Sequence, residues 1–207
     1  MFAQLAQSLG VAYASGISPY ATVALLGLGA RLGWVGPLPG ELNVLTHTGV
    51  IALAAALYAI EFLATLVPWV ASAWETVHSL VRPPAAALLA VLTVWGGDPA
   101  LVVAAGLLGG GLGLATHATK LGVRYAVDTS PEPVTNGMAN VAEVSVVAAI
   151  GYFVWQHPVV TLVLALVLLA ILMVAVHVVW RTLRRAVTGF RRPGRAGAGD
   201  RGTTTGD

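Results

Sequence analysis

The chain has 207 residues, of which 57% are apolar and only 10% are charged, with a formal net charge of +2. A water-soluble domain carries about 25% charged residues, so this composition excludes an ordinary soluble fold and indicates a surface that largely faces lipid. Cysteine is absent, which excludes disulfides, thiolate metal sites and cysteine nucleophiles.

An α-helix needs roughly 20 mostly apolar residues to cross a hydrocarbon core ~30 Å thick. In chain order, the sequence predicts six spans, at residues 5–33, 45–67, 84–95, 100–119, 134–155 and 159–180. The first is interrupted at Gly16–Pro19, and the third is short enough to re-enter the membrane instead of crossing it. Four runs end on a tryptophan, as expected of an aromatic belt at the interface: Trp34, Trp95, Trp155 and Trp180. We therefore expect an all-α, polytopic transmembrane helix bundle.

Residues 68–82 precede the third predicted span and show a different pattern. Apolar residues recur at helical spacing on one side, and the other side carries Ser72, Glu75, His78, Ser79 and Arg82. This pattern is typical of a helix that lies in the interface plane with its polar face toward water. A connector packed on protein is the alternative.

The basic residues predict the topology, because positive charge marks the cytoplasmic side of a membrane. Seven of the eleven follow Val179. We predict a transmembrane domain at residues 1–180 and a largely disordered cytoplasmic tail at 181–207. Six spans place the N-terminus in the cytoplasm as well, in a bacterial inner membrane. If the third segment re-enters the membrane instead of crossing it, the predicted orientation of every segment before it is reversed.

A faint internal similarity predicts two repeats. Arg31-Leu32-Gly33 recurs as Lys120-Leu121-Gly122, and Pro68 recurs as Pro158. The repeats would cover residues 14–95 and 100–180 with three spans each, and would be inverted relative to one another, as in many transporters.

Polar residues recur at helical spacing on both sides of the turn at residues 130–133. They are His117, Lys120 and Arg124 before the turn and Asn136, Asn140 and Glu143 after it. Lys120 and Glu143 are nearly equidistant from the turn, so an antiparallel hairpin would place them at similar depth. We predict that their charged atoms lie within ~8 Å, the reach of a direct or water-bridged hydrogen bond. Such a pair could fix the register of the hairpin or belong to a polar pathway.

Glu61 lies alone in an apolar run, where a carboxylate needs a cationic partner. Candidate partners are Arg82, His78 and Arg31. We predict that Glu61 is a functional titrating group, and we place Glu132 in the same network of buried charges.

Prolines mark four predicted helix breaks, at Pro19, Pro83, Pro131 and Pro133. Broken helices expose backbone groups, which are tolerated at membrane depth only beside protein or a water-filled cavity. A proline in the first turn is equally an ordinary helix start. The GxxxG spacings between Gly106 and Gly113 predict close approach of another helix.

The sequence lacks the His-Glu-x-x-His, Walker A and Gly-x-Ser-x-Gly motifs, and we expect neither a cofactor nor a metal. The expected partners are the lipid bilayer and, at the basic tail, anionic lipid headgroups. A homo-oligomer is left open, and no nucleic acid partner is expected.

Several stretches together resemble one family. They are Gly16–Thr22, Leu57–Phe62, Val77–Pro83, His117–Lys120 and Ser130–Asn136. The chain is similar in them to the bacterial membrane proteins known as domain of unknown function 4126. Relatives tend to have an Asp-Lys pair where this chain has Thr65-Leu66. The resemblance implies a membrane protein and no particular activity.

These features give three functional hypotheses. The first is a transporter or channel-like permease for an ion, small solute or lipid, with the buried charges lining its pathway. The second is a non-transporting membrane scaffold or assembly factor, and the third is a membrane enzyme that acts on lipid. The first predicts a cavity that reaches Glu61 or Lys120, whereas the second predicts dry, fully paired charges.

Overall fold

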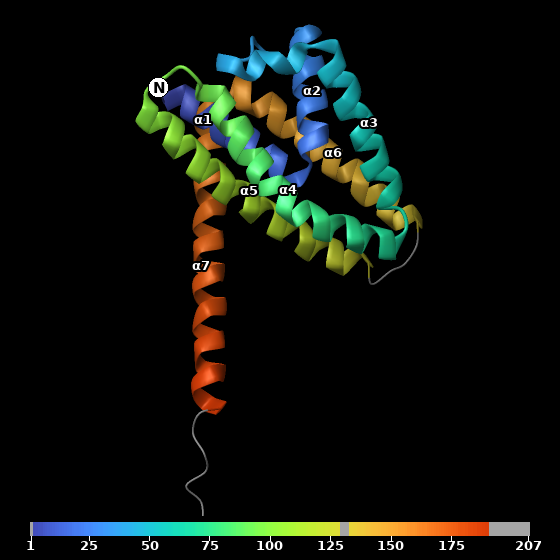
Figure 1. The fold of residues 1–207 in the computed structure, drawn as a ribbon, viewed down its shortest axis with the longest axis vertical. Helices are drawn as coiled ribbons and strands as arrows, with labels where there is room; N and C mark the ends of the chain where they lie inside the picture. Colours follow the sequence, from blue (N-terminus) through green and yellow to red (C-terminus); the bar gives the residue numbers. More distant parts are fainter. Residues whose placement is uncertain (1, 129–132, 191–207) are drawn as a thin grey trace, which may run out of the picture. The chain divides into compact units, whose positions relative to one another are not determined.

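The computed structural model describes residues 2–128 and 133–190, and every element in these ranges is helical (Figure 1). The elements are α1 (Phe2–Ile17), α2 (Pro19–Arg31), the 3₁₀ helix η1 (Gly40–Thr46), α3 (Thr48–Ala64), α4 (Pro68–Val94), α5 (Pro99–Asp128), α6 (Pro133–Gln156) and α7 (Pro158–Phe190). The predicted all-α class is confirmed. The chain forms two compact units, residues 1–170 and 171–207, and every contact described below lies within the first.

The described helices are of membrane type. Three of them, α4, α5 and α6, are long and apolar enough to cross a membrane, and η1 with α3, bent by 73°, adds a fourth if the pair forms one span. Large apolar side chains such as Leu63, Leu107 and Met138 are 65–74% exposed, which suits a surface covered by lipid. The count of six spans and the inverted repeat stay predictions.

Residues 68–94 form one continuous helix, which corrects two predictions. The expected interfacial helix at 68–82 and the short span or re-entrant segment at 84–95 are both parts of α4. Pro83 does not break the helix, since neighbouring helices in a membrane can accommodate a proline that lacks an N–H. On the polar side of residues 68–82, Glu75, His78 and Arg82 are buried against protein, whereas Ser72 is exposed.

The predicted break at Pro19 is present. Ser18 is extended between α1 and α2 (φ −153°, ψ 109°), and its hydroxyl accepts a hydrogen bond from the Ala21 N–H at 3.3 Å. Pro19 occupies the first turn of α2, where its missing N–H costs nothing. Pro133 begins α6, whereas Pro131 and Glu132 lie outside the described residues.

Small residues bring α4 and α5 close together over part of their length, and α1 packs against both (Figure 1). A Cβ added to Gly109 would lie 2.5 Å from the Cβ of Ala90, and one added to Gly113 would clash with Ala86. The packing role predicted for the GxxxG spacings is confirmed. Further along α5 the same helix face carries His117, so the close packing leads directly into polar residues.

Candidate functional site

Three acidic and three basic side chains meet inside the first unit. We call them the charge cluster: Glu61 from α3, Glu75 and Arg82 from α4, Lys120 and Arg124 from α5, and Glu143 from α6. All except Glu143 are at most 6% exposed. The formal charges cancel, which is the condition under which ionised groups can be buried together.

Arg82 is fully buried and joins two carboxylates. Its Nη2 donates to Glu61 Oε1 at 2.6 Å and to Glu75 Oε1 at 3.2 Å, and its Nη1 donates to Glu75 Oε2. The predicted pairing of Glu61 with Arg82 is therefore present. Of the other two candidate partners, Arg31 donates to Thr48 at 2.9 Å, and His78 contacts Tyr20 at 3.2 Å.

His117 is oriented by Arg82. The guanidinium Nη1 lies 2.8 Å from His117 Nδ1, and because arginine can only donate, Nδ1 accepts. The proton of the neutral ring is then on Nε2, which donates to the Ser79 hydroxyl at 2.8 Å. Ser79 in turn donates to the backbone carbonyl of Glu75 at 2.9 Å. His117 thus takes part as a neutral hydrogen-bonding group that links α4 to α5.

Lys120 contacts all three carboxylates. Its Nζ lies 3.5 Å from Glu61, 3.2 Å from Glu75 and 2.9 Å from Glu143. The predicted contact between Lys120 and Glu143 is confirmed. Lys120 also donates to the carbonyl of Ile17 at 3.0 Å.

The break between α1 and α2 gives each helix end a partner of suitable charge. The C-terminal carbonyl of Ile17 faces the Lys120 ammonium, and a helix C-terminus carries partial negative charge. Ser18, at the positive N-terminus of α2, donates to Glu61 Oε2 at 2.7 Å. The two half-helix ends therefore add to the electrostatic stabilisation of the charge cluster.

Arg124 ties α5 to α6. Its Nε donates to Glu143 Oε1 at 2.7 Å, and its Nη2 donates to the Asn140 side-chain carbonyl. The Asn140 amide donates to the Phe62 carbonyl at 3.1 Å, and Thr65 donates to Asn140 at 3.1 Å. Asn140 thereby connects the charge cluster to the end of α3.

Four buried groups have no hydrogen-bond partner among the described residues: Trp74 Nε1, Arg82 Nε, Arg124 Nη1 and the side-chain amide of Asn136. Asn136 is fully buried and lies one turn before Asn140. Unpaired buried polar atoms are rare in proteins and call for an explanation, such as a ligand or an ordered water.

Sequence reasoning missed Glu75 and Ser18. Glu75 had been assigned to a water-facing side of residues 68–82, but it lies two turns from Arg82 on the same face of one helix. That i, i+7 spacing of opposite charges was the available signal. Ser18 gave the ordinary signal of an N-cap, and its second bond to Glu61 depends on the tertiary fold.

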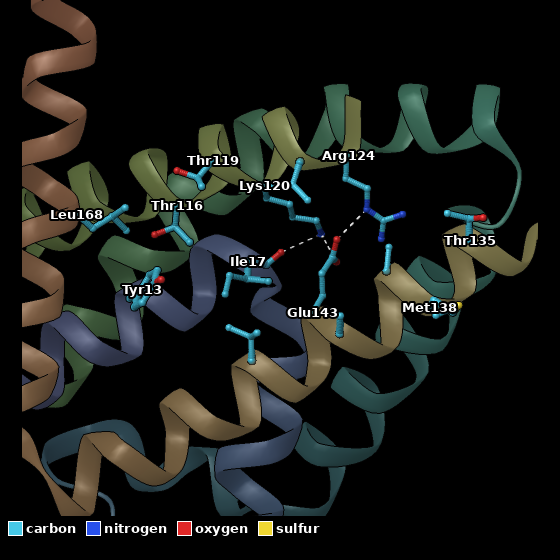
Figure 2. Close-up of a pocket in the computed structure, with 14 residues that line it drawn as sticks. Tyr13, Ile17, Thr116, Thr119, Lys120, Arg124, Thr135, Met138, Glu143 and Leu168 are labelled. Atoms are coloured by element: carbon cyan, nitrogen blue, oxygen red, sulfur yellow. Dashed lines mark hydrogen bonds and ion pairs between the residues drawn. The ribbon is translucent and has the colours of Figure 1, made fainter. Parts of the chain in front are cut away.

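Two cavities border the charge cluster. The α5–α6 cavity, about 540 Å³, is lined by residues of α1, α5 and α6 and by Leu168, and includes Lys120, Arg124 and Glu143. Figure 2 shows Glu143 reaching from α6 between the two cations of α5. The α4–α5 cavity, about 260 Å³, is lined by Glu75, Arg124 and five further residues of the two helices. Arg124 lines both cavities.

The sequence matches the family described as Domain of unknown function (DUF4126) over residues 5–178. The chain belongs to this family. The match includes every member of the charge cluster, from Glu61 to Glu143. No curated protein and no solved structure matches the chain.

Proposed function

We propose that the protein is a transporter or channel-like permease in which the charge cluster is the polar site of the passage. The observation that carries the proposal is that two cavities reach the cluster, and that Arg124 lines both. A passage needs polar groups that a solute can approach from more than one direction. A group that borders two cavities is suited to hand a charged solute from one to the other.

The free-energy cost of placing these charges in a membrane favours a functional role for them. Ionised side chains cost about 2.5–3.5 kcal/mol each at the centre of a membrane helix on insertion scales, and a well-packed apolar set of the same size is often as stable as a buried ion pair. Six of them in one membrane bundle are expensive as a purely structural device. The break at Ser18, whose flanking helix ends face Lys120 and Glu61, resembles the discontinuous helices that form binding sites in transporters.

A membrane scaffold is the second candidate, and a specific observation favours it. The charge cluster links four helices, and each of the six side chains has at least one partner of opposite charge. Such a network would fix the arrangement of α3, α4, α5 and α6 even if nothing passed through it.

Flux through reconstituted vesicles separates the two candidates. The purified protein is placed in phosphatidylcholine vesicles, and the movement of protons, sodium ions, inorganic phosphate and fluorescent phosphatidylglycerol is compared with that in protein-free vesicles. The transporter predicts flux of at least one probe. Glu61→Gln should lower that flux about tenfold or more, since losing about 1.4 kcal/mol of interaction corresponds to a factor of ten.

Glu41→Gln is the matched control, because Glu41 is an exposed carboxylate on η1 away from the cluster. It should leave the flux unchanged. If Glu61→Gln does not fold, Glu143→Gln replaces it as the test variant in the flux assay. Vesicles that carry none of the four probes faster than protein-free vesicles, at verified incorporation of folded protein, would contradict a transport function and favour the scaffold.

We also propose a bacterial inner-membrane location with both termini in the cytoplasm. The support is the concentration of basic residues after Val179, which should also bind anionic lipid headgroups. A fluorescent protein fused to the C-terminus, of a kind that folds only in the cytoplasm, should be bright. If this fusion is dark, and a C-terminal fusion to a reporter that is active only in the periplasm is active, the proposed orientation is contradicted.

A further inference from the structure

The α5–α6 cavity has the form of a site for a molecule with an apolar body. Its volume of about 540 Å³ lies within the range of about 300–1,000 Å³ typical of small-molecule sites. The walls away from the charges are mostly apolar and include Val123, Met138, Val146 and Leu168. Figure 2 shows Met138 toward one end of the cavity and Leu168 toward the other.

The cavity is reached from the bilayer. Met138 is 69% exposed and Val123 is 60% exposed, so the cavity wall continues onto the outer surface of α5 and α6. Both helices are candidate membrane spans, so the opening would face lipid in a bilayer. An amphiphile can enter sideways from the membrane without passing through water.

The inner wall of the cavity carries two cationic side chains and one anionic one. Lys120 and Arg124 line it together with a single carboxylate, Glu143. Arg124 is 3% exposed, and its Nη1 donor has no partner among the described residues. A buried guanidinium with an unused donor binds an anion more strongly than a neutral acceptor, since charge-assisted hydrogen bonds are about twice as strong.

We propose that the α5–α6 cavity binds a single-chain amphiphile with an anionic phosphate or carboxylate headgroup, supplied by the surrounding bilayer. The headgroup binds Arg124 and Lys120, and the chain lies along the apolar wall formed by Val146, Met138 and Leu168. This inference rests on the proposed transport function and names its substrate class.

Glu143 is the group that the headgroup displaces. Its side chain is 21% exposed, against 5% for Glu61 and 6% for Glu75, so it is the most accessible carboxylate of the charge cluster. It already occupies Arg124 Nε and Lys120 Nζ, the two cationic donors that line the cavity with it. An incoming anion therefore competes with Glu143, and binding frees this carboxylate to move.

Three probe molecules distinguish the contribution of the headgroup to binding from that of the chain. Hexadecyl phosphate carries both, hexadecanol lacks the charge, and inorganic phosphate lacks the chain. Binding to the purified protein in nanodiscs of phosphatidylcholine is followed by native mass spectrometry. Hexadecyl phosphate should bind saturably and at least about tenfold more tightly than either of the others, because each lacks one of the two contacts.

Substitutions inside and outside the α5–α6 cavity test whether the amphiphile binds there. Ala142→Phe fills the cavity without removing a charge, and it should weaken binding of hexadecyl phosphate about tenfold or more. Its matched control is Ala149→Phe, on an exposed position of α6 that does not line the cavity and should bind as the wild type does. Arg124→Gln should weaken binding by a similar factor. Glu143→Gln, which removes the competing carboxylate, should bind as tightly as the wild type or more so.

Equal binding of hexadecyl phosphate and hexadecanol would overturn the proposal, because the charge would then have no role. Equal effects of Ala142→Phe and Ala149→Phe would overturn it as well. Inorganic phosphate binding as tightly as hexadecyl phosphate would assign the site to a soluble anion instead. Any of these results, obtained while the vesicles still show Glu61-dependent flux of another probe, removes the substrate class and leaves the transport function standing.

Discussion

The α4–α5 helix pair has two halves that are packed in opposite ways. In one half, Ala86 and Ala90 of α4 meet Gly109 and Gly113 of α5, with so little space that an added Cβ would collide. In the other half, the same two helix faces continue with larger, polar and charged side chains: Glu75, Ser79 and Arg82 from α4 and His117, Lys120 and Arg124 from α5.

The difference shows how one pair of helices can hold a rigid scaffold and a polar site together. Small residues let the backbones approach and pack without water, which suits a membrane where the hydrophobic effect does not drive helices together. The charged half is held by hydrogen bonds and ion pairs, and it is the half that borders the two cavities. We infer that the alanine–glycine half positions the charged half.

The largest effect is expected at Arg82, in the charged half. Arg82→Gln leaves Glu61 and Glu75 without their main partner, and breaking a buried pair in this way costs about 3–5 kcal/mol. The free energy of unfolding in mixed micelles should fall by that amount. Adding Glu75→Gln should restore part of it, because one unpaired charge is then removed.

Arg31→Gln is the control for this variant, since Arg31 is exposed and bonded only to Thr48 among the described residues. It should change the unfolding free energy little. If Arg82→Gln proved no less stable than Arg31→Gln, the ion pairs would not hold the charged half together.

A smaller effect is expected at Gly113, in the close-packed half. Gly113→Ala places a methyl group against Ala86, and overpacking of this kind costs about 1–3 kcal/mol. Gly122→Ala, later in the same helix, meets no atom within 4 Å and should stabilise the helix by about 0.5–1 kcal/mol. Measured unfolding free energies that shift in the same direction for both variants would contradict the close packing.

The smallest effect is expected at Thr65, at the edge of the charge cluster. Thr65→Val removes a hydroxyl whose one proton is shared between the Asn140 side chain and the carbonyls of Glu61 and Phe62. It should cost about 1 kcal/mol, the usual net value of one hydrogen bond. Thr76→Val removes a hydroxyl that donates to the Ser72 carbonyl of its own helix, so it should cost less in the same unfolding assay. The reverse order would mean that Asn140 is not anchored through Thr65.

Local patterns in the sequence were sufficient to predict part of this arrangement. The helix break at Ser18-Pro19 follows from residue preferences at helix starts, and the contact of Lys120 with Glu143 follows from their equal separation from a turn. Both depend only on neighbouring helices in the chain.

The rest depends on contacts that no local pattern encodes. A polar stripe on residues 68–82 looks the same whether it faces water or buried charges, so the role of Glu75 could not be recognised. The sequence predicts a helix break at Pro83, although α4 continues through Pro83 and Pro84. The cavities are lined by side chains that lie far apart in the sequence, so they are a property of the packed bundle.

The most direct test is whether a water-soluble reagent reaches the charge cluster. The chain has no cysteine, so a single one can be introduced cleanly at Thr76, which lines the α4–α5 cavity, and at Leu80, which is 80% exposed one turn away. In intact vesicles, a membrane-impermeant methanethiosulfonate should label Thr76→Cys much faster than Leu80→Cys, because Thr76 lines the α4–α5 cavity. Thr76→Cys that stays unlabelled, or that reacts no faster than Leu80→Cys, would mean that the charges lie in a dry, closed network and would contradict the account.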